Sequence, residues 1–445
     1  MDALTVGIDI GTTSVKAVAV AADGTIVASA RVPHTVHAPD ADTFEHDAGA
    51  AWIDGVLRAW DQVGEHLDIA AVTVSAMVPS LCGVDDTGRP ITPGLLYGDA
   101  RGRDDAEDGS VAGEVVGFAR SLADLDGVAA LWPAQAVANH ALCGTGAIDT
   151  TTAMTMAPLF DGTGWDEDRL APLGLSASRL PEFMAGATPV GQRGSTLVSG
   201  GTVDALAEQT VADARAPGDV LVICGTTLIP WALTDVWFEI DGLWTIPYSV
   251  PDVIAIGGAS NAGGLFIDHV RRLTGDPDQQ EVCAVAPDAR PLWLPYIRGE
   301  RTPFHDPRLR ARLLDVGIGH GPAAVLAAAY DAAGFVVRHH LDLARPELDR
   351  AGTAPTRIVA TGGGTRSPAW MQALADCTGL SVDVSAHPEG AALGAAFHSR
   401  LTAGLESDNT SARGWSRISH RIEPRPAHVE AADRRYTRFR EATAR

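Results

Sequence analysis

Two segments of the chain share one pattern, in which an apolar run meets a Gly-Thr-Thr turn and a second apolar run follows. The first copy spans Val6–Val20 and the second spans Val220–Leu233. Apolar runs rich in Val and Ile on both sides of a glycine turn are typical of paired strands, so each segment predicts a β-hairpin. Because the pattern returns about half-way along the chain, we expect two halves built on one plan.

The pattern between and after the hairpins alternates between strand and helix signals. Trp52, Ile53, Val56, Leu57 and Trp60 recur at helical spacing, which predicts a helix over residues 47–66. The other predicted elements are strands near 25–36, 69–75, 80–85, 242–247, 253–257 and 358–361, and helices near 132–142, 263–273 and 321–343. Strands that alternate with helices predict an α/β fold.

A chain of 445 residues exceeds what one hydrophobic core usually supports, so two domains are expected. The turn-rich segment Ala216–Asp219 precedes the second hairpin and marks the boundary. We therefore predict domains over residues 1–217 and 218–445. The basic segment from Arg413 to Arg445 is predicted to be a solvated helix.

Charge and cysteine content exclude several classes of protein. The formal net charge of −22 opposes nucleic acid and anionic membranes as partners. Five scattered cysteines without CxxC spacing fit a reducing compartment better than a disulfide framework or a zinc site. No secretion signal and no apolar run long enough to span a bilayer stands out, so we expect a cytoplasmic protein.

The first hairpin carries candidate chemistry at its turn. Asp9 lies within an apolar run, where an unpaired carboxylate would cost several kcal/mol, so a nearby cation is expected. The backbone and side chains of Gly11, Thr12, Thr13 and Lys16 are suited to holding a phosphate. An acid beside a phosphate indicates Mg²⁺. The alternative is an ordinary hairpin with a turn-capping acid.

The second half offers two further turns. Gly225, Thr226 and Thr227 repeat the first turn, and Gly362–Gly364 form a triple-glycine turn before Ser367. Glycines allow a flat ring to lie against bare backbone. Neither a GxGxxG fingerprint nor a GxxxxGK[ST] loop occurs, so the chain supports neither a Rossmann site nor a P-loop.

Two other stretches bear acids with competing interpretations. Asp204 follows a Gly-Gly break at the start of an Ala-rich helix, where it could simply cap the helix or act in catalysis. An apolar run delivers Tyr97, Asp99 and Arg101 to its end, and these side chains could bind a sugar or form a surface ion pair.

Taken in order, these motifs resemble the FGGY carbohydrate kinases, and most closely the xylulokinase branch of that family. The resemblance extends over almost the whole chain. It rests on Asp9–Thr13, Gly201–Ala205, Cys224–Thr227, Tyr296–Pro303, Gly362–Ser367 and Gly390–Gly394.

The resemblance implies two duplicated RNase H-like domains of the actin, hexokinase and Hsp70 type, with an interdomain cleft. The first domain would bind the sugar and the second the nucleotide. ATP and Mg²⁺ are the implied cofactors, with Asp204 as general base and Asp9 as the acid that organises the metal. The implied phosphate and adenosine contacts are Gly11, Thr12, Thr13, Lys16, Gly225, Thr226, Thr227, Gly363, Gly364 and Ser367, and the implied sugar contacts are Met77, Tyr97, Asp99 and Arg101.

The chain departs from the family pattern on the sugar side. Met77-Val78 stands where xylulokinases usually have Met-His, and the segment between Asp105 and His140 is shorter than the family norm. D-xylulose, giving the 5-phosphate, is the expected substrate, and ribulose, gluconate or glycerol are the alternatives. A non-catalytic sugar or nucleotide sensor and an actin-like filament former are rival interpretations. The expected partner is a small-molecule sugar, and a homodimer is an open alternative for the assembly.

Overall fold

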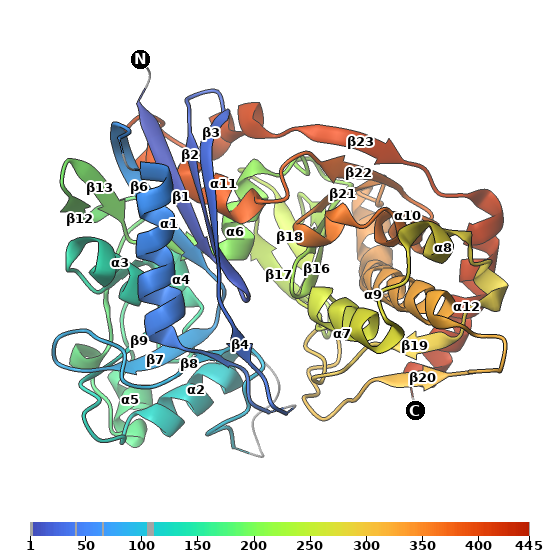
Figure 1. Ribbon diagram of the computed structural model, residues 1–445, viewed down its shortest axis with the longest axis horizontal. Coiled ribbons are helices and arrows are strands. Elements are labelled where there is room, and N and C mark those ends of the chain that lie inside the picture. The colour runs from blue at the N-terminus through green and yellow to red at the C-terminus, as the bar shows by residue number, and fades with distance from the viewer. Residues whose placement is uncertain (1–2, 41, 65, 105–110, 445) are drawn as a thin grey trace. The chain divides into compact units, whose positions relative to one another are not determined.

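The computed structural model describes residues 3–40, 42–64, 66–104 and 111–444, and the chain forms two compact units (Figure 1). Unit 1 contains residues 1–211 and 389–415, and unit 2 contains residues 212–388 and 416–445. The predicted division at 217/218 gives each domain one continuous stretch of the chain. Each unit instead contains two stretches, because residues 389–415 return to unit 1.

The main sheet of unit 1 is built around β1, which carries Asp9. Strand β1 pairs with β2 in antiparallel fashion and with β6 in parallel fashion. The strand order is β12 (Pro189–Arg193), β13 (Thr196–Ser199), β6 (Ile69–Ala76), β1 (Leu4–Ile10), β2 (Ser14–Val20) and β3 (Ile26–Pro33), and β14 (Thr202–Val203) pairs with the end of β6. The first hairpin is confirmed.

The main sheet of unit 2 repeats this plan. Strand β15 pairs with β16 in antiparallel fashion and with β21 in parallel fashion, as β1 does with β2 and β6. The strand order is β17 (Trp244–Pro247), β18 (Ile254–Gly257), β16 (Leu228–Thr234), β15 (Asp219–Cys224), β21 (Arg357–Thr361), β22 (Ser381–Ser385) and β23 (Ile418–Ile422). The internal repeat in the sequence is therefore a repeat of topology.

The remaining strands form smaller sheets. In unit 1 these are β4 (Val36–His37), β5 (Glu45–His46), β8 (Gly94–Leu96), β7 (Ser80–Val84) and β9 (Ala130–Trp132) in that spatial order, and the pair β10 (Ala147–Asp149) and β11 (Glu182–Met184). In unit 2 they are β19 (Leu292–Leu294) and β20 (Arg312–Leu314).

The helices complete an α/β fold. Those of unit 1 are α1 (Gly55–Gly64), preceded by a π-helical turn over Gly49–Asp54, α2 (Val111–Leu122), α3 (Ala134–Cys143), α4 (Thr150–Met154), α5 (Glu167–Leu170), α6 (Asp204–Val211) and α11 (Gly390–Thr402). Those of unit 2 are α7 (Gly264–Thr274), α8 (Gln279–Ala284), α9 (Pro322–Ala351), α10 (Pro368–Thr378) and α12 (Pro426–Thr443). None of the helices in the described ranges is long and apolar enough to cross a membrane.

Helix α11 belongs to unit 1 because small residues let it approach β1 and α6 closely. A Cβ at Gly7 would overlap the Ala392 carbonyl oxygen, and a Cβ at Gly394 would overlap that of Ala207. The Ser399 hydroxyl also donates to the Val6 carbonyl oxygen at 2.7 Å. The small residues of α11 therefore allow close packing against α6.

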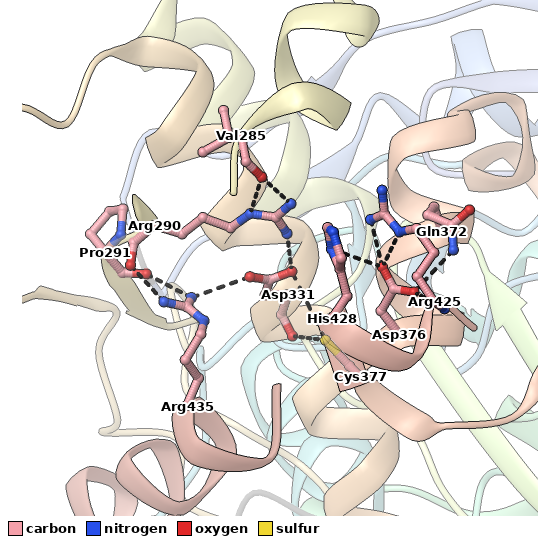
Figure 2. Close-up of polar contacts among 10 residues, drawn as sticks. All are labelled: Val285, Arg290, Pro291, Asp331, Gln372, Asp376, Cys377, Arg425, His428 and Arg435. Atoms are coloured by element: carbon pink, nitrogen blue, oxygen red, sulfur yellow. Dashed lines mark hydrogen bonds and ion pairs between the residues drawn. The ribbon is translucent and has the colours of Figure 1, made fainter. Parts of the chain in front are cut away.

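The C-terminal segment is more ordered than the charge run predicts. It forms β23 and then α12, whose Tyr436 and Phe439 are buried in the unit 2 core. Arg435, on the same helix, donates to an oxygen of Asp331 at 3.2 Å (Figure 2). The prediction of a solvated helix is wrong for this face, since the apolar positions among the arginines supply a packing stripe.

Candidate active site

Asp9 lies near the end of β1, directly opposite Lys16 on β2 and Ser75 on β6. The Lys16 ammonium lies 3.3 Å from Asp9 Oδ2, and the Ser75 hydroxyl lies 3.4 Å from Asp9 Oδ1. The Asp9 side chain is buried, and the cation expected beside it is Lys16. The ammonium is therefore engaged by a carboxylate in this structure.

Asp204 reaches the same edge of the sheet along a different path. Strand β14 pairs with β6 so that Thr202 lies opposite Ser75, which itself lies opposite Asp9. Neighbouring strands are about 4.8 Å apart, so this row spans roughly 10 Å. Asp204 follows two residues after Thr202 and begins α6. The structure thus brings together the two carboxylates on which the resemblance depends.

Burial and neighbouring charges raise the pKa of Asp204 to about 7. Desolvation is the largest cause, followed by the negative charge of Asp9 and then that of Glu208, whereas the Ala205 N–H and Lys16 lower the pKa. The Ala205 N–H donates to Asp204 Oδ1 at 2.7 Å, while Oδ2 makes no hydrogen bond within the described part of the chain. A carboxyl with a pKa near neutrality and one uncommitted oxygen is suited to accepting a proton.

Two further acids surround Lys16. The pKa of Lys16 is raised, first by Asp9 and also by Glu208 and Glu389. Glu208 lies one helical turn after Asp204 and is buried, and a Cβ at Gly390 would lie 2.9 Å from its Cγ and Oε1 atoms. Sequence reasoning did not single out either glutamate. The i, i+4 spacing from Asp204 was the available signal for Glu208.

Side chains from other elements hold the first Gly-Thr-Thr turn in place. Tyr97 was predicted as a sugar contact, and His46 was not given a role from the sequence. The Thr12 hydroxyl shares a 2.9 Å hydrogen bond with the Tyr97 hydroxyl, and Thr13 is exposed. The Trp52 N–H donates to His46 Nδ1 at 3.0 Å, so the Nε2–H of His46 donates to the Thr12 carbonyl oxygen at 2.8 Å. Burial, with the nearby His34, lowers the pKa of His46 to about 4, which keeps the ring neutral.

The predicted sugar contacts differ in how much surface they present. Met77 and Tyr97 are buried, and the Asp99 side chain has no exposed surface. The Phe44 N–H and the Arg101 guanidinium both donate to Asp99, at 2.7 Å and at 2.7 and 2.9 Å. Arg101 remains 39% exposed and also pairs with Glu45. Asp99 and Arg101 therefore hold each other, and only Arg101 presents much surface.

In unit 2, the second Gly-Thr-Thr turn joins β15 to β16 and rests on the start of α7. The N–H groups of Gly264 and Leu265 donate to the carbonyl oxygens of Gly225 and Thr226, at 2.8 and 3.0 Å. The first-turn N–H groups of α7 are thus used to fix the turn.

The triple-glycine turn lies beside it, because β21 and β15 are parallel neighbours. Gly362 has φ of +88°, and a Cβ there would lie 2.8 Å from the Cys224 carbonyl oxygen. Gly363 is exposed, whereas Gly364 packs under Trp370. The Ser367 hydroxyl caps α10 through the Trp370 N–H and donates to Gln279 at 2.8 Å. These residues form one region within unit 2.

Comparisons with known proteins identify the family of the chain. Residues 4–109 match the model of the N-terminal domain of the FGGY family of carbohydrate kinases, and residues 220–399 match the model of its C-terminal domain. A xylulose kinase of Streptomyces rubiginosus is 29% identical over 93% of this chain and 90% of its own length. A glycerol kinase of Allorhizobium ampelinum is 27% identical over 95% of each chain, and a gluconokinase of Bacillus subtilis is 25% identical over 89% of this chain and 86% of its own.

Solved structures support the fold. A xylulose kinase from Rhodospirillum rubrum has a TM-score of 0.76 at 24% identity and covers 99% of this chain and 98% of its own. A gluconate kinase from Lactobacillus acidophilus has a TM-score of 0.79 at 19% identity, with the same coverage. The predicted fold of two RNase H-like domains is confirmed. Both family models match in the expected order, and the chain belongs to the FGGY family of carbohydrate kinases, enzymes that use ATP as phosphoryl donor.

Proposed function

We propose that this carbohydrate kinase transfers the γ-phosphoryl group of ATP to a terminal hydroxyl of a ketopentose, with D-xylulose as the first candidate. The main support is that Asp9 and Thr202 both lie opposite Ser75 on neighbouring strands of the unit 1 sheet, and Asp204 follows two residues after Thr202. The xylulose kinases among the relatives support the substrate class. Gluconate, ribulose and glycerol are the alternatives within the family.

In the proposed reaction, Asp204 Oδ2 accepts the proton of the substrate hydroxyl. The hydroxyl oxygen forms a bond to the γ-phosphorus as the bond from that phosphorus to the bridging oxygen of ADP breaks. Removal of the proton by a placed carboxylate contributes about 10²–10⁴ in rate. The N-terminus of α6 stabilises the ionised carboxylate between turnovers, since the Ala205 N–H donates to its other oxygen.

Asp9 is the proposed residue for a divalent metal. The described residues contain no cluster of three His, Cys, Asp or Glu side chains that could form a metal cage. Mg²⁺ is usually bound by one or two carboxylates together with substrate phosphates and water, and the buried Asp9 carboxylate beside Ser75 could supply one such ligand. The metal would neutralise charge on the phosphates, and Asp9 would orient it. Lys16 would keep Asp9 paired when no metal is bound.

The turns of unit 2 are the proposed nucleotide contacts. Gly225, Thr226 and Thr227 would lie along the phosphates, and Gly363, Gly364 and Ser367 would border the adenosine. The exposed backbone at Gly363 supports a flat ring lying there. Met77, Tyr97, Asp99 and Arg101 remain the proposed sugar side. Arg101 is the member with exposed donors, and Tyr97 and Asp99 would position it and the first turn.

A coupled assay of ADP release across xylulose, ribulose, gluconate and glycerol tests the proposal. We expect xylulose to give the largest kcat/KM, and Asp204→Ala to abolish release while ADP binding stays within about threefold. A larger kcat/KM with gluconate or glycerol would reassign the substrate. Sugar-independent ADP release that no substrate stimulates would contradict the assignment of a sugar acceptor.

A further inference from the structure

Gln135 on α3 is a fully buried amide that contacts the ends of two strands at once. Its Nε2 lies 3.3 Å from the carbonyl oxygen of Ala76, at the end of β6, and 3.2 Å from that of Thr202 in β14. Carbonyl oxygens only accept hydrogen bonds, so the NH₂ group of the amide must face them. The orientation of the amide is therefore fixed by its partners.

The segment that Gln135 contacts is the one that delivers Asp204. The Gly201 N–H donates to the Ser199 hydroxyl at 3.0 Å, and Thr202 and Val203 pair with Ser75 and Ala76 on β6. Gly201 has φ of +97°, and a Cβ there would lie 2.9 Å from the Val74 carbonyl oxygen and 3.2 Å from Gln135 Cβ. The backbone before Asp204 is thus confined between β6 and the Gln135 side chain.

The amide is retained at a cost. Its Oε1 atom is buried and has no hydrogen-bond partner among the described residues. A buried acceptor left in that state costs about 1–3 kcal/mol. An apolar side chain of the same size would avoid this cost and still fill the space. The two donated hydrogen bonds are what such a side chain could not supply.

We infer that Gln135 is a positioning residue for the phosphoryl-transfer reaction, holding the strand end that carries Asp204 against the end of β6 that leads to Met77. This inference rests on the proposed role of Asp204 as general base. A base must lie within hydrogen-bond reach of the hydroxyl it deprotonates, and a displacement of about 1 Å can cost on the order of 10² in rate. Gln135 acts through the Thr202 and Ala76 backbone.

Asn139 provides a matched control one turn farther along the same helix. It is also buried, and its Nδ2 donates at 2.9 Å to the carbonyl oxygen of Ala147 in β10, not to the Ala76 or Thr202 carbonyl oxygens that Gln135 contacts. Asn139→Leu and Gln135→Met each remove one buried amide from α3. Both variants should lose stability, but only the second should alter the placement of Asp204.

The test measures kcat, sugar KM, ADP affinity and thermal unfolding for both variants. For Gln135→Met we expect kcat to fall by about 10–100-fold, with the sugar KM and ADP affinity within about threefold of wild type. Asn139→Leu should keep the wild-type kcat per folded molecule. A Gln135→Met enzyme that is less stable but has the wild-type kcat would overturn the inference and leave Gln135 a purely structural residue.

Gly201→Ala keeps the test decisive if Gln135→Met does not fold. The added methyl group would press on Val74 and on the Gln135 side chain and so displace the same segment without removing the amide group, and kcat should fall with ADP affinity retained. A folded Gly201→Ala enzyme with the wild-type kcat would contradict the inference. Asp204→Ala is assayed in parallel, because turnover in that variant would refute the proposed base, whereas a wild-type kcat in Gln135→Met alone would refute only the positioning role.

Discussion

Two buried groups of acids in this kinase are built in opposite ways. In unit 1, Asp9, Asp204 and Glu208 all lie near Lys16. In unit 2, Asp331 accepts hydrogen bonds from both Arg290 and Arg435 (Figure 2). In unit 2 one acid meets two guanidinium groups, whereas in unit 1 several acids lie around the same ammonium group.

The neighbouring Asp376 follows the unit 2 plan. The Arg425 guanidinium and backbone N–H both donate to it, and His428 lies 3.6 Å away (Figure 2). Asp331 and Asp376 fasten the C-terminal segment to α9 and α10. Acids that are fully paired hold elements in place, whereas Asp204, whose pKa is raised by burial and by Asp9, is a candidate for chemistry.

Removing the Asp331 carboxylate from the unit 2 group should have the largest effect on stability. Asp331→Ala leaves Arg290 and Arg435 buried without their carboxylate, which should lower the free energy of unfolding by about 3–5 kcal/mol. Chemical denaturation measures this loss, and kcat per folded molecule should not change. Asp288→Ala, which removes an exposed ion pair with Arg434, is the control and should cost under about 1 kcal/mol. Equal losses for the two variants would show that the buried ion pairs of Asp331 stabilise the fold no more than an exposed ion pair does.

A substitution at Asp9, in the unit 1 group, should instead affect catalysis. Asp9→Asn keeps the shape of the side chain but removes the charge, and kcat/KM with Mg²⁺ and ATP should fall by about 10²–10³. Binding of ADP in the presence of EDTA should stay near the wild-type affinity. A variant with the full Mg²⁺-dependent rate would show that Asp9 does not serve the metal.

The pH dependence of the rate should report the raised pKa of Asp204. The carboxyl must be ionised to accept a proton and has a pKa of about 7, so kcat/KM should fall about tenfold for each pH unit below 7 and level off above it. Because the folded pKa exceeds the unfolded one, the stabilising contribution of this group is complete below the unfolded pKa and is lost as the pH rises through 7. A rate that is constant from pH 5 to 8 would contradict this assignment.

The smallest expected effect concerns Glu208. Its charge raises the pKa of Asp204, so Glu208→Gln should shift the acidic limb of the rate profile to lower pH by about half a unit. Glu389→Gln is the matched control, since Glu389 acts on Lys16 and should move the limb less. A shift to higher pH in Glu208→Gln would show that Glu208 does not act through its charge.

Local patterns predicted the parts of the fold that local residues decide. The two hairpins, the helix start at Asp204 and the glycine turns follow from β-branched runs, capping acids and glycines close together in the chain. The return of residues 389–415 to unit 1 could not be read from that segment, because it depends on the contact of Gly7 and Ala392, far apart in sequence. Packing also decided the C-terminal helix, where Tyr436 and Phe439 outweigh the surrounding arginines.

The candidate site was predictable only in part for the same reason. Motifs identified Asp9 and Asp204, but the hydrogen bond between Thr12 and Tyr97 and the two carbonyl contacts of Gln135 join residues more than 50 positions apart. Glu208 was visible at i, i+4 from Asp204, yet its burial depends on Gly390. The segment between Asp105 and His140, which is shorter than the family norm, includes residues 105–110, and these lie outside the described residues.

The central claim is that the Asp204 carboxylate removes the proton from the substrate hydroxyl beside Asp9. Its most direct test is a single-turnover, rapid-quench measurement of phosphoryl transfer by wild type and Asp204→Asn at saturating xylulose and ATP. The account predicts that the rate of transfer falls by about 10²–10⁴ in the variant, with unchanged nucleotide binding and thermal stability no lower than that of wild type. Transfer by Asp204→Asn at the wild-type rate would contradict it.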